Sequence, residues 1–152
     1  MRLLSYPAIC ILIVLVVGIS LRTHAQAEPR PAMTPQTHVT SSPAYAELLL
    51  RRTEVESDLE ALVLEYTDEF PAVVNLKQHL LSIQKEIGLL SKVKAADAGR
   101  LTLALGKLMV KRAELQAAHT KLLSGYKEEH PDVKRAKRRI EIYDKAIKDI
   151  LG

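Results

Sequence analysis

The sequence predicts an all-α protein made of two tandem helical hairpins, packed as an antiparallel four-helix bundle or as an elongated coiled coil. One observation is an internal repeat with an offset of 60 residues, which indicates a tandem duplication. The other is the spacing of apolar residues in each repeat, which alternates between three and four positions as in packed α-helices. The chain has 152 residues and is 47% hydrophobic, so one packed domain is expected.

Residues 1–27 are predicted to be a signal peptide. An uninterrupted apolar run covers residues 8–21 and is shorter than the roughly 20 residues that a membrane span needs. Ala25 and Ala27 supply the small side chains that a signal peptidase requires, so cleavage is expected after Ala27. The alternative is an uncleaved anchor that begins at Leu3. The rest of the chain is expected to be periplasmic or secreted, or anchored to the inner membrane if the leader is retained.

Removal of this leader changes the chemistry of the remaining chain. The single cysteine, Cys10, is lost with it, so no disulfide, thiol nucleophile or cysteine metal site is expected. Arg2 and Arg22 are lost as well, which leaves 20 basic and 18 acidic residues. The resulting net charge of +2 argues against a protein that binds nucleic acid through its overall charge.

Residues 28–43 are predicted to form an extended, flexible linker. They contain Pro29, Pro31, Pro35 and Pro43 among small and polar residues. Such a composition disfavours a helix and offers little to bury, so no helix is expected in this stretch.

The repeat covers the rest of the chain, with a first hairpin at residues 44–93, a connector at 94–100 and a second hairpin at 101–152. Identical residues recur throughout both units at the same offset. The matches include Ala44 and Ala104, Leu48 and Leu108, Arg52 and Arg112, Glu54 and Glu114, Leu62 and Leu122, Tyr66 and Tyr126, Glu69 and Glu129, Pro71 and Pro131, and Val73 and Val133.

The apolar stripe of each unit, which we call the seam, is expected to form the helix contacts. In the first unit the seam consists of Leu48, Val55, Leu59, Leu62, Tyr66, Val73, Leu76, Leu80, Ile83, Ile87 and Leu90. In the second unit it consists of Leu101, Leu105, Leu108, Leu115, Leu122, Tyr126, Val133, Ala136, Ile140, Tyr143, Ile147 and Ile150.

Each hairpin is expected to turn just before a proline. Pro71 and Pro131 suit the first position of a helix, and proline disfavours helical geometry at the residue before it. Between the hairpins, the polar residues Lys94 and Asp97 interrupt the seam and predict another turn. Because the seam spacing continues through both junctions, the alternative is a long central helix from Pro71 to Ser124.

Polar residues on the seam are candidates for function or for helix register. Arg52 and Arg112 occupy the same seam position in the two units. They are either register devices or, as we favour, arginines whose stems pack while the guanidinium reaches water. His119 is expected to be a half-buried core residue, and His130, which corresponds to Phe70, is expected to pack over the start of the next helix.

The last helix carries a basic run. We expect it to be a solvated helix face, and its functional interpretation is a patch for anionic glycan or phospholipid head groups. No aromatic residues are interleaved to stack bases, so nucleic acid is not an expected partner. The run consists of Lys134, Arg135, Lys137, Arg138 and Arg139.

The sequence contains few residues or motifs that could support catalysis. The sequence has no glycine-rich phosphate loop, no nucleophile elbow and no thiol beyond the leader. His79, His119 and His130 lack metal-ligand spacing with a third ligand in view. We therefore expect a protein that binds other molecules, with no enzymatic activity, cofactor or metal.

The turn of the second unit resembles a known motif. The segment from Tyr126 through His130 and Pro131 to Val133 is similar to the Tyr-x-x-x-His-Pro-x-Val segment of polysaccharide chain-length determinant (co-polymerase) proteins. In that family the segment lies in the extracytoplasmic helical arm, where it joins long helices that project from the membrane and pack side by side in a ring. The resemblance is confined to this arm.

The first unit has the same pattern, with Tyr66, Pro71 and Val73 at matching positions and Phe70 in place of the histidine. The resemblance implies an extracytoplasmic coiled-coil hairpin that associates with other helices. We therefore expect a binding or scaffold protein that contacts a protein partner, or further copies of itself, through its helical seam, in cell-envelope or exopolysaccharide assembly. The alternatives are a periplasmic chaperone-like adaptor and a membrane-anchored surface protein whose basic last helix contacts anionic lipid or glycan.

Overall fold

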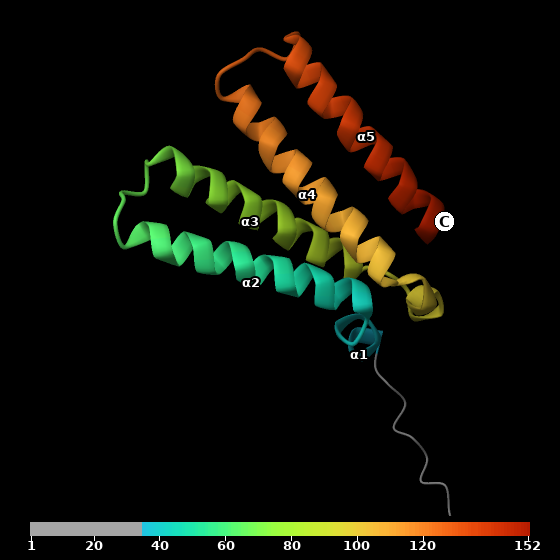
Figure 1. The fold of residues 1–152 in the computed structure, drawn as a ribbon. Helices are drawn as coiled ribbons and strands as arrows, with labels where there is room; N and C mark the ends of the chain where they lie inside the picture. Colours follow the sequence, from blue (N-terminus) through green and yellow to red (C-terminus); the bar gives the residue numbers. More distant parts are fainter. Residues whose placement is uncertain (1–34) are drawn as a thin grey trace, which may run out of the picture. The chain divides into compact units, whose positions relative to one another are not determined.

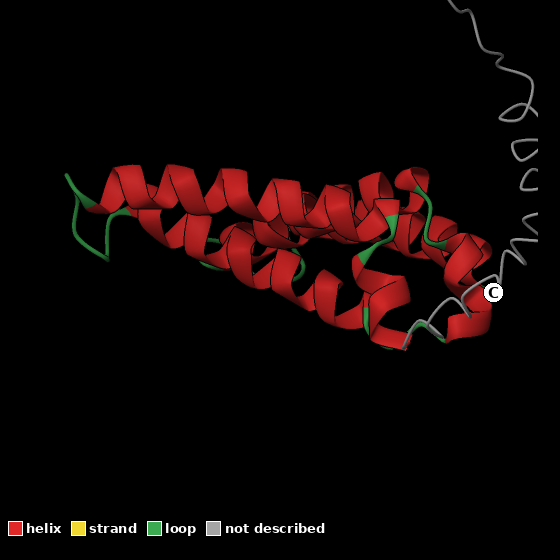
Figure 2. Ribbon diagram, turned by 90° about the horizontal axis from the view of Figure 1, so that it is seen from below, coloured by secondary structure: helices red, strands yellow, loops and turns green. Residues whose placement is uncertain are grey.

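The structure, a computed structural model, describes residues 35–152, and this part of the chain is all-α, as the sequence predicted. No β-strand occurs within it (Figure 2). The predicted leader and the first part of the predicted linker, residues 28–34, lie outside the described residues. The elements are α1 (Pro35–Thr40), α2 (Pro43–Val63), α3 (Pro71–Leu90), the short 3₁₀ helix η1 (Ala95–Arg100), α4 (Leu103–Leu123) and α5 (Pro131–Leu151).

The second part of the predicted linker is helical, so the expectation of an extended chain was wrong there. Pro35 begins α1 and Pro43 begins α2. At the first position of a helix the missing N–H of proline would have no partner in any case, so these prolines start helices where they were expected to prevent them. Ser42 caps α2, because its Oγ accepts a hydrogen bond from the backbone N–H of Tyr45 at 3.2 Å. Val39 of α1 is buried in the core.

Each predicted hairpin forms from two neighbouring helices, α2 with α3 and α4 with α5 (Figure 1). Pro71 begins α3 and Pro131 begins α5, which confirms the predicted helix starts. The preceding residues, Phe70 and His130, have ψ angles of 129° and 137°, outside the helical region, as a following proline requires.

The alternative of one continuous central helix was wrong, because the helix is interrupted at residues 91–102. Within this break η1 forms, and α4 then starts at a cap in which Thr102 Oγ1 accepts from the N–H of Leu105 at 3.3 Å. The guanidinium of Arg100 donates to the carbonyl oxygen of Leu151, so the connector is tied to the end of α5.

The four long helices do not form a closed bundle. α4 is central and packs against α2, α3 and α5. α5 packs on α4 and also touches η1, but it does not pack against α2 or α3. The described residues therefore form a three-helix unit of α2, α3 and α4, to which α5 adds as an outer helix.

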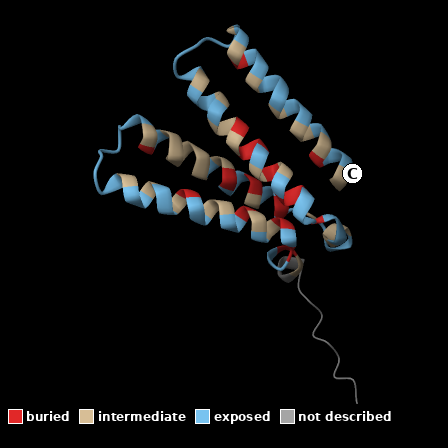
Figure 3. Cartoon of the chain, in the orientation of Figure 1, coloured by how far each residue is buried: buried red, intermediate tan, exposed pale blue. Residues whose placement is uncertain are grey.

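The core is concentrated at the end of the hairpins nearest η1, and exposed residues predominate toward the turns (Figure 3). Every seam residue is buried or half-buried except Tyr66 and Tyr126, which belong to the turns. The two hairpins are thus joined at their base, and their turn ends are less tightly enclosed. The buried apolar cluster consists of Val39, Ala44, Leu48, Val55, Ile83, Leu90, Leu101, Leu105, Met109, Ala113 and Ile147.

Candidate functional site: the cleft between the hairpins

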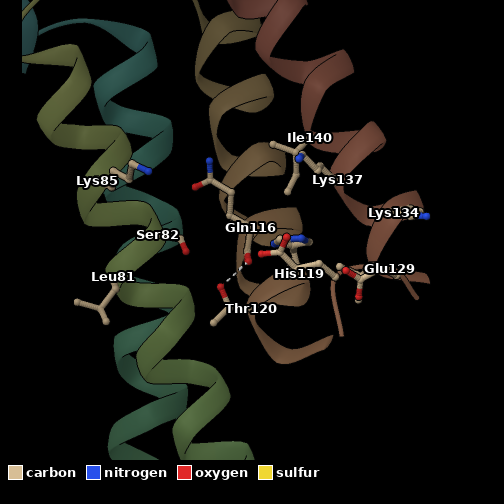
Figure 4. Close-up of a pocket in the computed structure, with 12 residues that line it drawn as sticks. Leu81, Ser82, Lys85, Gln116, His119, Thr120, Glu129, Lys134, Lys137 and Ile140 are labelled. Carbon is tan, nitrogen blue, oxygen red and sulfur yellow. Dashed lines mark hydrogen bonds between the residues drawn. The ribbon is translucent and has the colours of Figure 1, made fainter. Parts of the chain in front are cut away.

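A cleft of about 710 Å³ lies between the two hairpins toward their turn ends (Figure 4). α3 provides one wall, α4 the floor, and α5 with the turn before it the other wall. The cleft exists because α3 and α5 both pack on α4 and not on each other. The side chains that characterise it are Leu81 and Lys85 from α3, His119 from α4, and Lys137 and Ile140 from α5.

The walls combine apolar surface with positive charge. Leu81 of α3 is 57% exposed, and Ile140 on the α5 wall is half-buried. Lys85, Lys134 and Lys137 line the same cleft, and within the described residues none of them has a carboxylate within 4.0 Å. Within this part of the chain, the ammonium groups of Lys85 and Lys137, on the two walls, are therefore free of ion pairs, whereas Figure 4 shows the Lys134 side chain pointing away from α4.

The floor of the cleft carries polar side chains. His119 is half-buried, as predicted, and has no hydrogen-bond or ion-pair partner in the described part of the chain. Thr120 Oγ1 donates to the carbonyl oxygen of Gln116 at 3.1 Å, so this hydroxyl is satisfied within its own helix. Glu128 and Glu129 line the end of the cleft at the turn.

The two predicted turn motifs adopt the same local geometry. The ring centroids of Tyr66 and Phe70 are 4.1 Å apart, and those of Tyr126 and His130 are 4.2 Å apart, so each turn is closed by a stacked pair. In the second turn His130 Nδ1 also accepts a hydrogen bond from the N–H of Asp132 at 3.2 Å. Phe70 has no such acceptor, so only the second turn has a side-chain cap.

The valine of each motif anchors the helix start. Val73 and Val133, two residues after Pro71 and Pro131, are buried. Together with the stacked rings, they place the motif residues in a structural role, because the motif closes the turn and fixes the first turn of α3 and α5.

The predicted basic run is exposed throughout but does not form a single face. At 100° per residue its five side chains spread over more than half of the circumference of α5. Lys134 and Lys137 line the cleft, whereas Arg135 pairs with Asp132 in the preceding turn of the helix. Arg138 and Arg139 have no ion-pair partner within the described residues.

A buried ionic network spans three helices next to the cleft. Arg112 of α4 donates from Nε to Glu86 Oε1 at 2.8 Å and from Nη2 to Glu86 Oε2 at 2.5 Å. Its Nη1 donates to Asp144 Oδ1 of α5 at 2.6 Å. Burial alone would lower the pKa of Arg112, but the hydrogen bonds and negative charges of Glu86 and Asp144 outweigh it and raise the pKa. Arg112 is therefore a buried charge with two partners, and the interpretation as an arginine that reaches water was wrong for it.

The equivalent arginine of the first unit behaves differently. Arg52 is half-exposed and donates from Nε to Glu56 Oε1 of the same helix at 2.7 Å. The stem-packing interpretation fits this residue. Glu86 was not among the residues predicted from the sequence. Its spacing from Ile83 and Leu90, three and four positions as in the seam, is the signal that marks it as a buried position.

A second polar layer joins α2, α3 and α4. Arg51 donates to Glu54 at 2.9 Å, and its Nη2 lies 3.4 Å from Glu114 of α4. His79 of α3 belongs to this layer, and its buried Nε2 has no hydrogen-bond partner. Burial and the positive charge of Arg51 lower the pKa of His79, against a smaller opposite effect of Glu114.

Two further features concern residues 35–152. Within this range no three His, Cys, Asp or Glu side chains are grouped so that they could hold a metal ion. None of its helices combines the length and the hydropathy of a membrane span. Comparison with known proteins does not indicate a ligand for the cleft. No family model, curated protein or solved structure matches this chain. The cleft must therefore be interpreted from its own geometry and charge.

Proposed function

We propose that the protein is a non-enzymatic helical binding module that holds an amphipathic helix of a partner protein in the cleft between its hairpins. The observation that carries this proposal is the cleft itself, which lies between α3 and α5 because both helices pack extensively on α4 and not on each other. Both helices flank α4, and an α-helix is about 10 Å wide with its side chains. A partner helix laid along α4 would contact three helices at once.

The cleft walls define the chemistry of this partner. An apolar stripe on the partner helix would cover Leu81 and Ile140, which otherwise remain in contact with water. Acidic residues beside that stripe would pair with Lys85 and Lys137 on opposite walls. The expected partner is therefore an amphipathic helix with negative charges next to its apolar face.

The setting we propose is outside the cytoplasm. Its support is the predicted leader, with small residues at Ala25 and Ala27, and the resemblance of the turns to the helical arm of chain-length determinant proteins. N-terminal sequencing of the protein from a soluble extracytoplasmic fraction tests the location. A chain that starts at Glu28 is expected, and an intact leader in the membrane fraction would instead support the membrane-anchored alternative.

Binding to the cleft is tested with two fluorescent helical peptides of equal length. Both carry leucine at three-four spacing, and the flanking charges are all glutamate in one peptide and all lysine in the other. In fluorescence anisotropy the glutamate peptide is expected to bind about tenfold more tightly or better, since tenfold corresponds to about 1.4 kcal/mol. Equal affinity for both peptides would contradict the proposal and favour a chaperone-like adaptor that recognises apolar surface alone.

A charge-reversal variant locates the binding. Lys85→Glu combined with Lys137→Glu should reverse the preference, so that the lysine peptide binds more tightly. The matched control is Lys107→Glu combined with Lys121→Glu, which makes the same charge change at exposed positions of α4 that do not line the cleft. An equal effect of both variants would show that the peptides respond to overall charge and not to the cleft.

A further inference from the structure

The two hairpins share one fold but carry opposite charge. Residues 43–90 contain nine acidic and four basic side chains, a formal charge of −5. Residues 103–151 contain seven acidic and twelve basic side chains, a formal charge of +5. The near-neutral total therefore conceals a strong separation of charge between the units.

This separation is not neutralised within the molecule. Among the described residues, two ion pairs connect the hairpins, Arg51 with Glu114 and Arg112 with Glu86. In the first pair the base, Arg51, belongs to the acidic hairpin and the acid, Glu114, belongs to the basic hairpin. This pair therefore does not reduce the difference in charge between the hairpins. The net charge of each hairpin is therefore not cancelled by ion pairs with the other hairpin.

The outer side of α2 presents acidic residues beside exposed leucines. Leu50 of α2 and Leu64, the residue that follows the helix, are 57% and 86% exposed and lie about 40° apart around the helix axis. Asp58 and Glu60 are exposed between them in the sequence, on opposite sides of these leucines around the helix, and have no ion-pair partner within the described residues. We call these four residues the acidic face.

The outer side of α5 presents the complementary pattern. Ile142 is 67% exposed, and Arg138 and Arg139 lie on either side of it around the helix. We call these three residues the basic face. α2 and α5 do not pack against each other and lie on different sides of α4 (Figure 1), so the two faces cannot meet within one molecule.

We infer that copies of this protein associate head to tail, with the acidic face of one copy against the basic face of the next. The occupant of each face is a second copy because each face has an exposed aliphatic side chain, and the charges of the acidic face are opposite in sign to those of the basic face. A contact between two different faces is heterologous, so it continues into a chain or closes into a ring. This inference goes beyond the proposed function, since it uses the outer faces of α2 and α5 and leaves the cleft free.

The test is a charge exchange followed by sedimentation velocity. One variant carries Asp58→Lys and Glu60→Lys, a second carries Arg138→Glu and Arg139→Glu, and a third carries all four changes. The wild-type protein is expected to form larger species at about 50 mM salt than at about 500 mM, because screening weakens contacts between exposed charges. Each two-residue variant should associate about tenfold more weakly or worse, and the four-residue variant should recover association.

Mixing the two defective variants gives a sharper result. One variant then carries two basic faces and the other two acidic faces, so neither should associate alone, whereas the mixture should assemble with the two variants in alternation. The control, Lys107→Glu with Lys121→Glu, changes charge on α4 and should associate as the wild type does. Recovery in the four-residue variant also shows that the loss in each two-residue variant is not a folding defect.

Two results would overturn the inference. One is a wild-type protein that stays monomeric at both salt concentrations. The other is a four-residue variant that fails to recover association. A monomer that binds phosphatidylglycerol vesicles, and loses this binding with Arg138→Glu and Arg139→Glu, would assign the basic face to an anionic surface. None of these outcomes tests peptide binding in the cleft, because Lys85 and Lys137 are unchanged in these variants.

Discussion

Arg112 and Glu86 join the two hairpins through a pair of parallel hydrogen bonds, and the Glu86 carboxylate has no exposed surface. The remaining amino group of Arg112 reaches Asp144 on α5. One guanidinium therefore contacts both helices that form the walls of the cleft. The network therefore links the two walls of the cleft through a single side chain of α4.

Removing one partner of this network is expected to be costly. Glu86→Leu would leave the guanidinium of Arg112 buried with only Asp144 to balance it, and breaking a buried pair in this way typically costs about 3–5 kcal/mol. Urea unfolding followed by circular dichroism measures the loss. Replacing both members, with Arg112→Met and Glu86→Leu, should restore much of the stability because no uncompensated charge remains.

The repeat provides a matched control at the equivalent position. Arg52→Met removes a half-exposed arginine whose partner, Glu56, lies in the same helix, so the loss should be below about 1 kcal/mol. If Arg52→Met and Arg112→Met destabilise the protein equally, the buried network is not what distinguishes the two units.

The sequence predicted the helices and their starts because these depend on local chemistry. Apolar spacing identified the helices, and the limited conformations of Pro71 and Pro131 identified where two of them begin. The same rule, applied to Pro35 and Pro43, would have predicted α1 and the start of α2. The error was to count these prolines as composition and to ignore their position relative to the residues that follow.

The packing of the hairpins could not be predicted in this way. Arg52 and Arg112 are identical in type and in seam position, and they differ because α3 and α5 place Glu86 and Asp144 beside Arg112. That placement depends on how α3 and α5 pack against α4, which a repeat within one chain does not specify. The cleft has the same origin, since it follows from the absence of packing between α3 and α5.

Gly106 is predicted to be required where α4 crosses α2. A Cβ at this position would lie 2.9 Å from Ala44 Cα and 3.0 Å from its carbonyl oxygen, and backbone atoms cannot move aside as a flexible side chain does. Gly106→Ala is therefore expected to destabilise the protein by about 1–3 kcal/mol despite the better helix propensity of alanine. Thermal or urea unfolding provides the measurement.

Gly88 is the control for this prediction. It lies within α3, and a Cβ added there would have no atom within 4 Å. Gly88→Ala should stabilise the protein by about 0.5–1 kcal/mol through helix propensity alone. Stabilisation by both alanines would show that α2 and α4 are not in close contact at Gly106.

The residue before the proline differs between the two turns, and exchanging it should change stability in opposite directions. His130→Phe keeps a ring for Tyr126 to stack on but removes the acceptor for the N–H of Asp132, so a loss of about 1 kcal/mol is expected. Phe70→His should supply the missing cap to α3 and stabilise the first hairpin by a similar or smaller amount. Unfolding midpoints of both variants measure the effect, and a stabilising His130→Phe would show that the cap contributes nothing.

His79 is expected to make the stability of the protein depend on pH. Its burial and the nearby charge of Arg51 lower its folded pKa below the ordinary value of 6.5, so the unfolded chain binds a proton more readily than the folded chain does. The stabilising contribution is therefore complete above about pH 6.5 and is lost as the pH falls through the folded pKa. The measurement is urea unfolding of the wild type and of His79→Gln across this range, with the wild type losing more stability on acidification.

An NMR titration of the His79 ring assigns this effect to its physical cause. In the wild type the midpoint should lie below 6.5. In Arg51→Gln, which removes a positive charge but leaves the ring buried, the midpoint should move up toward that value without reaching it, because burial is the larger of the two causes. A wild-type midpoint at or above 6.5 would mean that the ring is solvated and that α2, α3 and α4 do not enclose it.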